Sequence, residues 1–191
     1  MSEVKIALTG KMRAGKSLAT GYLTLHYGFQ PFAFGDELKD AFHRAFPHIA
    51  RYPKPRVYYQ SFGQWARKTI DEDIWVNACM REVNEYIDRH SCPCGKSTVL
   101  VLVEDCRQPN EYERLKREGF VIVRISASDN LRLARARREG DVFADEDLAH
   151  ETEQYIDEFA VDYEVTNNGS IIELEAQLDN IMLDLGVKGG V

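Results

Sequence analysis

Five short apolar runs alternate along the chain with longer amphipathic stretches, which is the pattern of an α/β protein. Strands are predicted over Val4–Thr9, Phe29–Phe34, Thr98–Val103, Val121–Ile125 and Val161–Thr166. The third run is continuous and rich in β-branched residues, as in a strand that is buried on both faces. Pro31 removes a backbone donor from the second run and therefore predicts an edge strand.

The stretches between these runs have helical spacing. Helices are predicted over Lys16–His26, Asp36–Phe46, Asn110–Glu118, Leu131–Glu139, Asp147–Phe159 and Ser170–Leu185, with two more between Arg56 and His90. Gly119 is suited to a helix C-terminus. Strands that alternate with helices predict a parallel sheet covered on both faces, and the long helical stretch before Thr98 reads as an insertion at one edge. The tail Lys188–Val191 is expected to fray.

Composition narrows the class of protein. The 191 residues are 44% hydrophobic and 29% charged, the balance of one globular domain with its own core. The net charge of −7 argues against a general affinity for nucleic acid or anionic membranes. No apolar run approaches the roughly 20 residues of a membrane span, and no signal-peptide pattern is present, so a cytoplasmic location is expected, in a host cell if the protein is viral. The sequence leaves open whether the chain is a monomer or a homodimer.

A phosphate-binding motif directly follows the first predicted strand. The segment fits the Gly-x-x-x-x-Gly-Lys-Ser pattern, with Gly10, Lys11, Met12, Arg13, Ala14, Gly15, Lys16 and Ser17, and Leu18 continues into a predicted helix. In this context, backbone N–H groups and the helix N-terminus point at phosphates. Lys16 is expected to reach the β- and γ-phosphates, and the Ser17 hydroxyl to bind Mg²⁺. ATP and Mg²⁺ are therefore the predicted cofactors.

The rest of the chain restricts the class of P-loop protein. It has no guanine-reading Asn-Lys-x-Asp segment, which argues against a GTPase. Helicase and transporter ATPases are usually larger. A short chain with an insertion on the acceptor side favours a small-molecule kinase.

Several segments resemble those of nucleoside monophosphate kinases. Phe34–Lys39 resembles their Gly-Asp-x-Leu-Arg segment, with Lys39 at the basic position. Val103–Glu111 is similar to the Asp-x-Arg-x-Pro-Asn-Glu run of phage-type deoxynucleoside monophosphate kinases. Further similar segments follow the order of that group: Gln60–Arg67, Asp73–Val76, His150–Glu153 and Asn167–Ser170. The resemblance covers almost the whole chain, and dephospho-coenzyme A kinases share much of this layout.

The resemblance implies a three-layer α/β kinase fold in a single domain, 1–191. Its five-stranded parallel sheet has the order 2-3-1-4-5, with an acceptor-binding helical insertion at 35–95 and a short lid at 130–148. The implied activity is Mg²⁺-assisted, ATP-dependent phosphorylation of a (deoxy)nucleoside monophosphate to the diphosphate. Two alternatives stay open: phosphorylation of a hydroxyl acceptor, as in dephospho-coenzyme A kinase, and a nucleotide-binding module without transfer.

Phosphoryl transfer brings two polyanions together, so the acceptor side needs cations. The candidates are Lys16, Lys39, Arg67, Arg107 and the arginines that follow Leu131. Arg107 is expected to bind the acceptor phosphate bidentately. Asp105 ends the strongest strand, where it could orient Mg²⁺ waters and line the acceptor site, and Glu104 is the alternative for the metal role.

Four further acceptor assignments follow from the resemblance and from residue type. Asp36 is a base for a hydroxyl acceptor; with a phosphate acceptor it positions the substrate or caps the next helix. Trp75 either stacks on a base or belongs to a core of the insertion that includes other aromatic residues. Asn110 and Glu111 complete the implied acceptor site.

The lid and the last loop carry the remaining candidates. Arg132 and Arg135 are three residues apart and share a helix face, where they would neutralise the transferred group; the alternative is a solvated basic helix. Asn167 either contacts the adenine or belongs to a plain turn. His90, Cys92 and Cys94 lie close together, but no second ligand pair follows, so free thiols are expected rather than zinc.

Overall fold

The computed structural model describes residues 3–91, 98–138 and 155–189. Five parallel strands form one sheet in the order β2-β3-β1-β4-β5, which confirms the predicted topology. The strands are β1 (Glu3–Thr9), β2 (Gln30–Phe32), β3 (Val99–Cys106), β4 (Val121–Ser126) and β5 (Tyr163–Thr166). β2 is an edge strand, as Pro31 predicts.

The helices lie close to their predicted positions. They are α1 (Lys16–Tyr22), which continues as a π-helical turn η1 (Leu23–Tyr27), α2 (Phe34–Ala45), α3 (Arg56–Thr69), α4 (Ile74–His90), α5 (Pro109–Arg117), α6 (Asp129–Arg138) and α9 (Ile171–Asp184). Of the helix predicted over Asp147–Phe159, the described part holds only a short 3-10 helix, η2 (Tyr155–Glu158). The remainder lies outside the described residues, as do the predicted lid after Arg138, Cys92 and Cys94.

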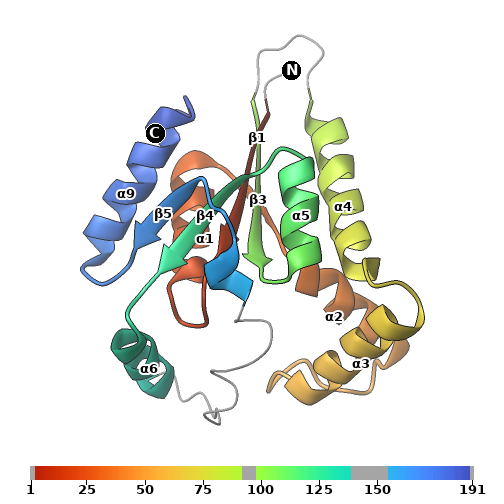
Figure 1. Ribbon diagram of the computed structural model, residues 1–191. Coiled ribbons are helices and arrows are strands. Elements are labelled where there is room, and N and C mark those ends of the chain that lie inside the picture. Colours follow the sequence, from red (N-terminus) through yellow and green to blue (C-terminus); the bar gives the residue numbers. More distant parts are fainter. Residues whose placement is uncertain (1–2, 92–97, 139–154, 190–191) are drawn as a thin grey trace.

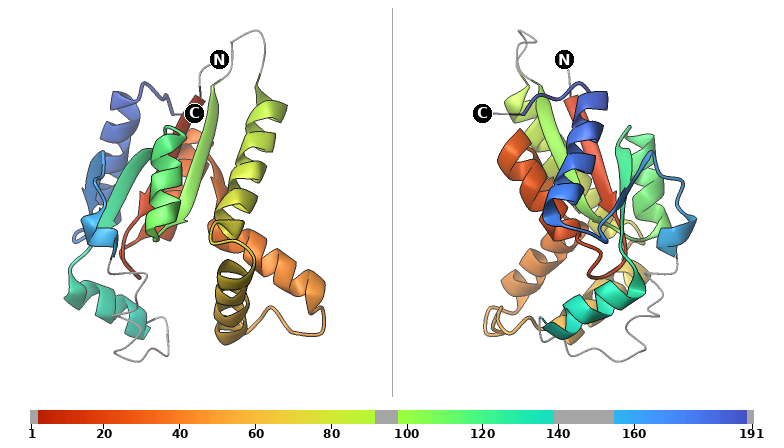
Figure 2. Two further views of the ribbon diagram at one scale, coloured as in Figure 1. Left: turned by 45° about the vertical axis from the view of Figure 1, so that its right-hand side comes forward. Right: turned by 90° about the vertical axis from the view of Figure 1, so that its left-hand side faces the viewer.

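Two apolar layers pack on opposite faces of the sheet (Figures 1 and 2). Side chains alternate along a strand, so Val101 and Val103 face α4 and α5 whereas Leu102 faces α1 and α9. Leu115 of α5 and Leu178 of α9 are fully buried against the two faces. This double burial explains why the strand sequences are nearly continuous apolar runs.

The carboxyl ends of the strands meet at one edge of the sheet. In Figure 1 the loop after β1 lies at this edge, between α6 on one side and α2 and α3 on the other. β3 is irregular there, because Val103 pairs with Ala7 whereas Cys106 pairs with Thr9, which leaves Glu104 and Asp105 in a bulge. Bulges re-aim side chains beside active sites.

Two other expectations concern thiols and membranes. Cys79 and Cys106 are buried and free, as predicted. Across the residues that the structure describes, none of the helices is both long enough and apolar enough to cross a membrane.

Candidate functional site

The loop between β1 and α1 is wound into a phosphate-binding conformation. Gly10, Arg13 and Gly15 all have positive φ, at 149°, 61° and 115°. A Cβ on Gly10 would lie 2.3 Å from the Ile125 carbonyl oxygen. The Lys16 ammonium donates to the carbonyls of Gly10 and Lys11 and so lies across the loop. This curled backbone with its lysine fits the triphosphate predicted from the motif.

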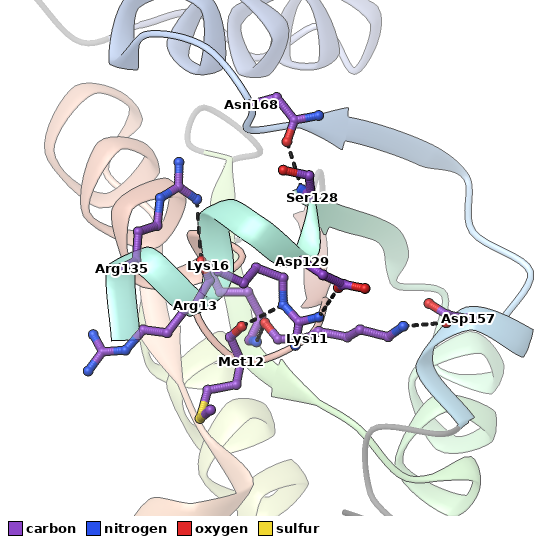
Figure 3. A network of polar contacts seen from close by, with 10 residues as sticks. Lys11, Met12, Arg13, Lys16, Ser128, Asp129, Arg135, Asp157 and Asn168 are labelled. Carbon is purple, nitrogen blue, oxygen red and sulfur yellow. Dashed lines mark hydrogen bonds and ion pairs between the residues drawn. The ribbon is translucent and has the colours of Figure 1, made fainter. Parts of the chain in front are cut away.

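Helix α6 lies over this loop and donates to its carbonyl groups (Figure 3). Arg132, only 6% exposed, donates from Nε to the Met12 oxygen at 2.8 Å and from a terminal nitrogen to Asp129 at 2.7 Å. Arg135 donates to the Arg13 oxygen at 3.3 Å. The two arginines predicted to share a helix face therefore meet the loop together, and α6 is not a solvated basic helix.

Asn167, the residue directly after β5, supports the loop between β1 and α1. Its side-chain amide is buried and donates to the Ala14 oxygen at 2.8 Å. The backbone carbonyl of Asn167 accepts from Arg135 at 3.0 Å. A Cβ on Gly15 would lie 2.1 Å from this amide. Asn167 thus holds the loop backbone and is more than part of a plain turn, and its contact with the adenine stays a prediction. On the opposite side, Lys11 pairs with Asp157 of η2 at 2.5 Å.

The two acids of the β3 bulge have different neighbours. Glu104 lies beside Thr20, one turn after Ser17 in α1, and burial raises the pKa of the Glu104 carboxyl. Asp105 instead accepts from the backbone amides of Phe34, at 2.9 Å, and Gly35, at 3.2 Å. Of the two, Glu104 is therefore on the Ser17 side, and Asp105 holds the start of α2.

No group of three or more metal-ligating side chains is present in the described part of the chain. A P-loop magnesium ion needs no such cage, because Mg²⁺ keeps several waters and takes phosphate oxygens. The exposed Ser17 hydroxyl on α1, and the carboxylate of Glu104 beside Thr20 of the same helix, are oxygen ligands of the type that Mg²⁺ prefers. The residues present therefore fit Mg-ATP.

The start of α2 differs from its prediction. The helix begins at Phe34 with Ala33 as its N-cap, so Asp36 lies in the first turn and does not cap it. The Asp36 carboxylate pairs with the Lys39 ammonium at 2.5 Å and is exposed. These two predicted acceptor residues thus lie together at the strand-end edge.

Arg67 and Arg107 converge on a buried acid of α5. Glu111 is 4% exposed, and its Oε2 accepts from the amides of Arg107 at 2.8 Å and Gln108 at 3.0 Å. Its Oε1 lies 4.0 Å from the Arg67 guanidinium. Burial raises the pKa of Glu111 to about 7, and the negative charge of Asp105 adds to the rise. Glu111 is therefore enclosed in the protein rather than presented to a ligand.

Two cations that sequence reasoning missed join this group. Burial lowers the pKa of the Lys54 ammonium, and the positive charges of Lys39, Arg56 and Arg107 lower it further, with only Asp36 opposing. Lys54 comes from the irregular connection between α2 and α3, and Arg56 is the first residue of α3. That connection lacks a periodic pattern, so its sequence gives no signal that these residues face the acceptor cations.

Two predicted acceptor residues belong to the insertion's own structure. Trp75 is 5% exposed, packs beside Phe62 and donates from its ring nitrogen to the Gly63 oxygen at 3.2 Å. It is therefore a core residue, which was the alternative weighed from the sequence, and it cannot stack on a base in this conformation. The Asn110 side chain donates to Asp73 at 2.8 Å and ties α5 to the start of α4.

The sequence matches no model of a known protein family, and no curated protein matches it either. Solved structures are nevertheless similar over nearly the full chain. TT1252 from Thermus thermophilus is 19% identical with a TM-score of 0.60, covering 97% of this chain and 99% of its own. A shikimate kinase from Acinetobacter baumannii in complex with shikimate is 16% identical with a TM-score of 0.55, covering 96% and 93%. A gluconokinase from Sinorhizobium meliloti is 17% identical with a TM-score of 0.52, covering 96% and 95%.

These similarities establish the fold. The chain has the α/β fold of P-loop kinases, with the predicted strand order and with helices on both faces of the sheet. The acceptor must be argued from the chain's own residues, because fold alone does not fix function.

Proposed function

We propose that this protein transfers the γ-phosphoryl group of Mg-ATP to the phosphate of a (deoxy)nucleoside monophosphate. The observation that carries the proposal is the placement of cations on both sides of one loop. Arg132 and Arg135 meet the P-loop from α6, while Lys39, Arg67 and Arg107 belong to the opposite, acceptor side. A cleft with cations on both sides suits two phosphorylated substrates that must approach each other.

The roles on the donor side follow from the loop. Lys16 would neutralise the β- and γ-phosphates, and the Ser17 hydroxyl, together with the Glu104 carboxylate, would hold Mg²⁺. The bound ion would supply charge neutralisation along the triphosphate. Arg132 and Arg135 hold the loop backbone in place, and from beside the loop they would stabilise charge on the transferred group.

The roles on the acceptor side favour a phosphate over a neutral hydroxyl. Lys39, Lys54, Arg56, Arg67 and Arg107 lie at an edge that also holds the acids Asp36, Asp105 and Glu111, so the cations outnumber the acids and the local charge is positive. An acceptor phosphate would relieve this repulsion. Its attacking oxygen is already ionised, so Asp36 needs no role as a base and can remain paired with Lys39.

The proposal is tested by measuring ADP release from Mg-ATP with each of the four deoxynucleoside monophosphates and with dephospho-coenzyme A. Turnover with at least one monophosphate is expected, and its loss in Lys16→Ala would tie it to the loop. An absence of turnover with every monophosphate would overturn the proposal. ATP binding without any acceptor-dependent turnover would favour a non-catalytic nucleotide-binding module.

A hydroxyl acceptor is the second candidate, favoured by the position of Asp36 at the strand-end edge. It predicts that Asp36→Asn abolishes turnover, because a hydroxyl must lose its proton. The phosphate acceptor predicts only a mild loss in this variant, since the substitution keeps an acceptor atom near Lys39.

A further inference from the structure

Two carboxylates on the acceptor side, the half-buried Asp105 and the buried Glu111, each hold a pair of consecutive backbone amides. Asp105 of β3 accepts from Phe34 at 2.9 Å and from Gly35 at 3.2 Å. Glu111 of α5 accepts from Arg107 at 2.8 Å and, with the same oxygen, from Gln108 at 3.0 Å. A carboxylate held by two amides is fixed in position, and it fixes the backbone that donates to it.

These amides belong to the segments that carry the proposed acceptor cations. Gly35 lies one turn before Lys39, whose ammonium would be 3.8 Å from a Cβ on Gly35. The Glu111 bond to Arg107 fixes the backbone of the acceptor arginine itself. Moving either carboxylate would therefore move a cation that the proposed reaction needs.

Arg67 connects the two acids across the insertion. Its guanidinium lies 4.0 Å from Glu111, and its charge also interacts with Asp105. A Cβ on Gly63 would lie 3.7 Å from an Arg67 nitrogen, so this side chain packs closely along α3. The same two acids therefore face cations from α2, α3 and the β3–α5 turn.

We propose that Asp105 and Glu111 are positioning residues, two backbone-anchored acids that set the geometry of Lys39, Arg67 and Arg107 for an acceptor phosphate. This inference rests on the proposed function. Asp105 then fixes the backbone at the start of α2 and does not serve as the metal ligand expected from its sequence position. Glu111 then fixes the backbone of the acceptor arginine and does not itself contact the acceptor.

Steady-state kinetics on Glu111→Gln test the charge of the pair. The glutamine oxygen can still accept from Arg107 and Gln108, but Arg67 loses its counter-charge. We expect the KM for the acceptor to rise about tenfold, equivalent to about 1.4 kcal/mol, with the KM for ATP changed less than about twofold. Glu111→Asp should recover part of this loss, because it restores the charge.

Asp105→Asn separates positioning from metal binding. We expect a rise of about tenfold in acceptor KM with an unchanged Mg²⁺ concentration for half-maximal activity. A marked increase in the Mg²⁺ requirement, with an unchanged acceptor KM, would overturn the inference for Asp105.

Glu173→Gln provides a matched control. Glu173 is also the third residue of a helix with a capping box, since it accepts from Ser170 at the start of α9. It is exposed and lies on the far side of the sheet from the insertion. Glu173→Gln should leave the acceptor KM unchanged. An equal rise in Glu173→Gln and Glu111→Gln would show that Glu111 acts only as a helix cap, which would overturn its positioning role.

Hydrogen exchange followed by mass spectrometry tests the pair without any turnover. Asp105→Ala should speed exchange in peptides that contain 34 and 35, and Glu111→Ala should do so at 107 and 108. Unchanged exchange would overturn the inference even if the wild-type protein is active. If the wild-type protein turns over no monophosphate, the proposed function fails, and these exchange rates still decide whether the acids hold the two segments.

Discussion

Gly15 and Glu111 show how single residues are constrained at this site. Gly15 has a φ of 115° and no space for a Cβ, because the Asn167 amide occupies it. Glu111 is enclosed with two amides, a guanidinium and a second acid around it. Each of these constraints lowers the stability of the fold or restricts which residue can stand at the position. Each also fixes the backbone beside the proposed phosphates.

The raised pKa of Glu111 predicts a pH-dependent cost to stability. The folded protein binds this proton up to about pH 7, whereas the unfolded chain loses it near 4.5. The free energy of unfolding of the wild type should therefore fall relative to Glu111→Gln as pH rises through this window, by up to about 3 kcal/mol. Urea denaturation of both proteins from pH 4.5 to 8 measures it, and parallel pH curves would contradict the assignment.

Lys54 gives a second prediction at the level of one side chain. Removing it in Lys54→Ala should weaken the attraction for an anionic acceptor and raise the acceptor KM about three- to tenfold, with a smaller change at high salt. Lys68→Ala, an exposed lysine on α3, is the control and should have no effect. Equal kinetics for both variants would remove Lys54 from the acceptor site.

At the level of elements, the hydrophobic periodicity predicted those strands and helices that depend on local sequence. All five strands and the order of the helices were predicted from apolar runs, because a doubly covered parallel sheet buries nearly every strand residue. The first turn of α2 was missed, because Asp36 suggests a cap whereas the tertiary contact of Asp105 with Phe34 and Gly35 starts the helix earlier. The different neighbours of Glu104 and Asp105 depend on a bulge, which local sequence does not encode.

Contacts between distant segments account for the rest of the site. Lys54 lies in an unpatterned connection and Arg56 at the start of α3, and only the packing of the insertion brings them to Arg107. The contact of Asn167 with the loop likewise joins residues over 150 positions apart. The sequence thus indicated which residue types carry the chemistry, and the fold determined which of them meet.

Helix α6 allows a prediction for an entire element. Arg135 donates to the loop at Arg13 and to Asn167, whereas Arg137 of the same helix is exposed. Arg135→Ala should lower kcat/KM for ATP by about 10²-fold, because it releases the loop from the helix. Arg137→Ala should remain within about twofold of the wild type. Similar losses in both variants would indicate a general charge effect.

At the scale of the whole molecule, the sheet provides one edge at which two groups of cations face a common loop. The donor group depends on β1, α1 and α6, and the acceptor group on β3, α5 and the insertion (Figure 1). Both groups lie at the carboxyl ends of the strands, which is the edge where open α/β sheets bind ligands. The central claim is that a phosphoryl group passes between them to another phosphate.

Phosphorus NMR of the reaction products tests this claim most directly. After incubation of the protein with Mg-ATP and a deoxynucleoside monophosphate, we predict that the monoester signal is replaced by a pair of coupled phosphoanhydride signals from the diphosphate. If the monoester signal of the monophosphate is unchanged, and a parallel incubation with dephospho-coenzyme A instead yields a new phosphate monoester, the phosphate-acceptor account is contradicted.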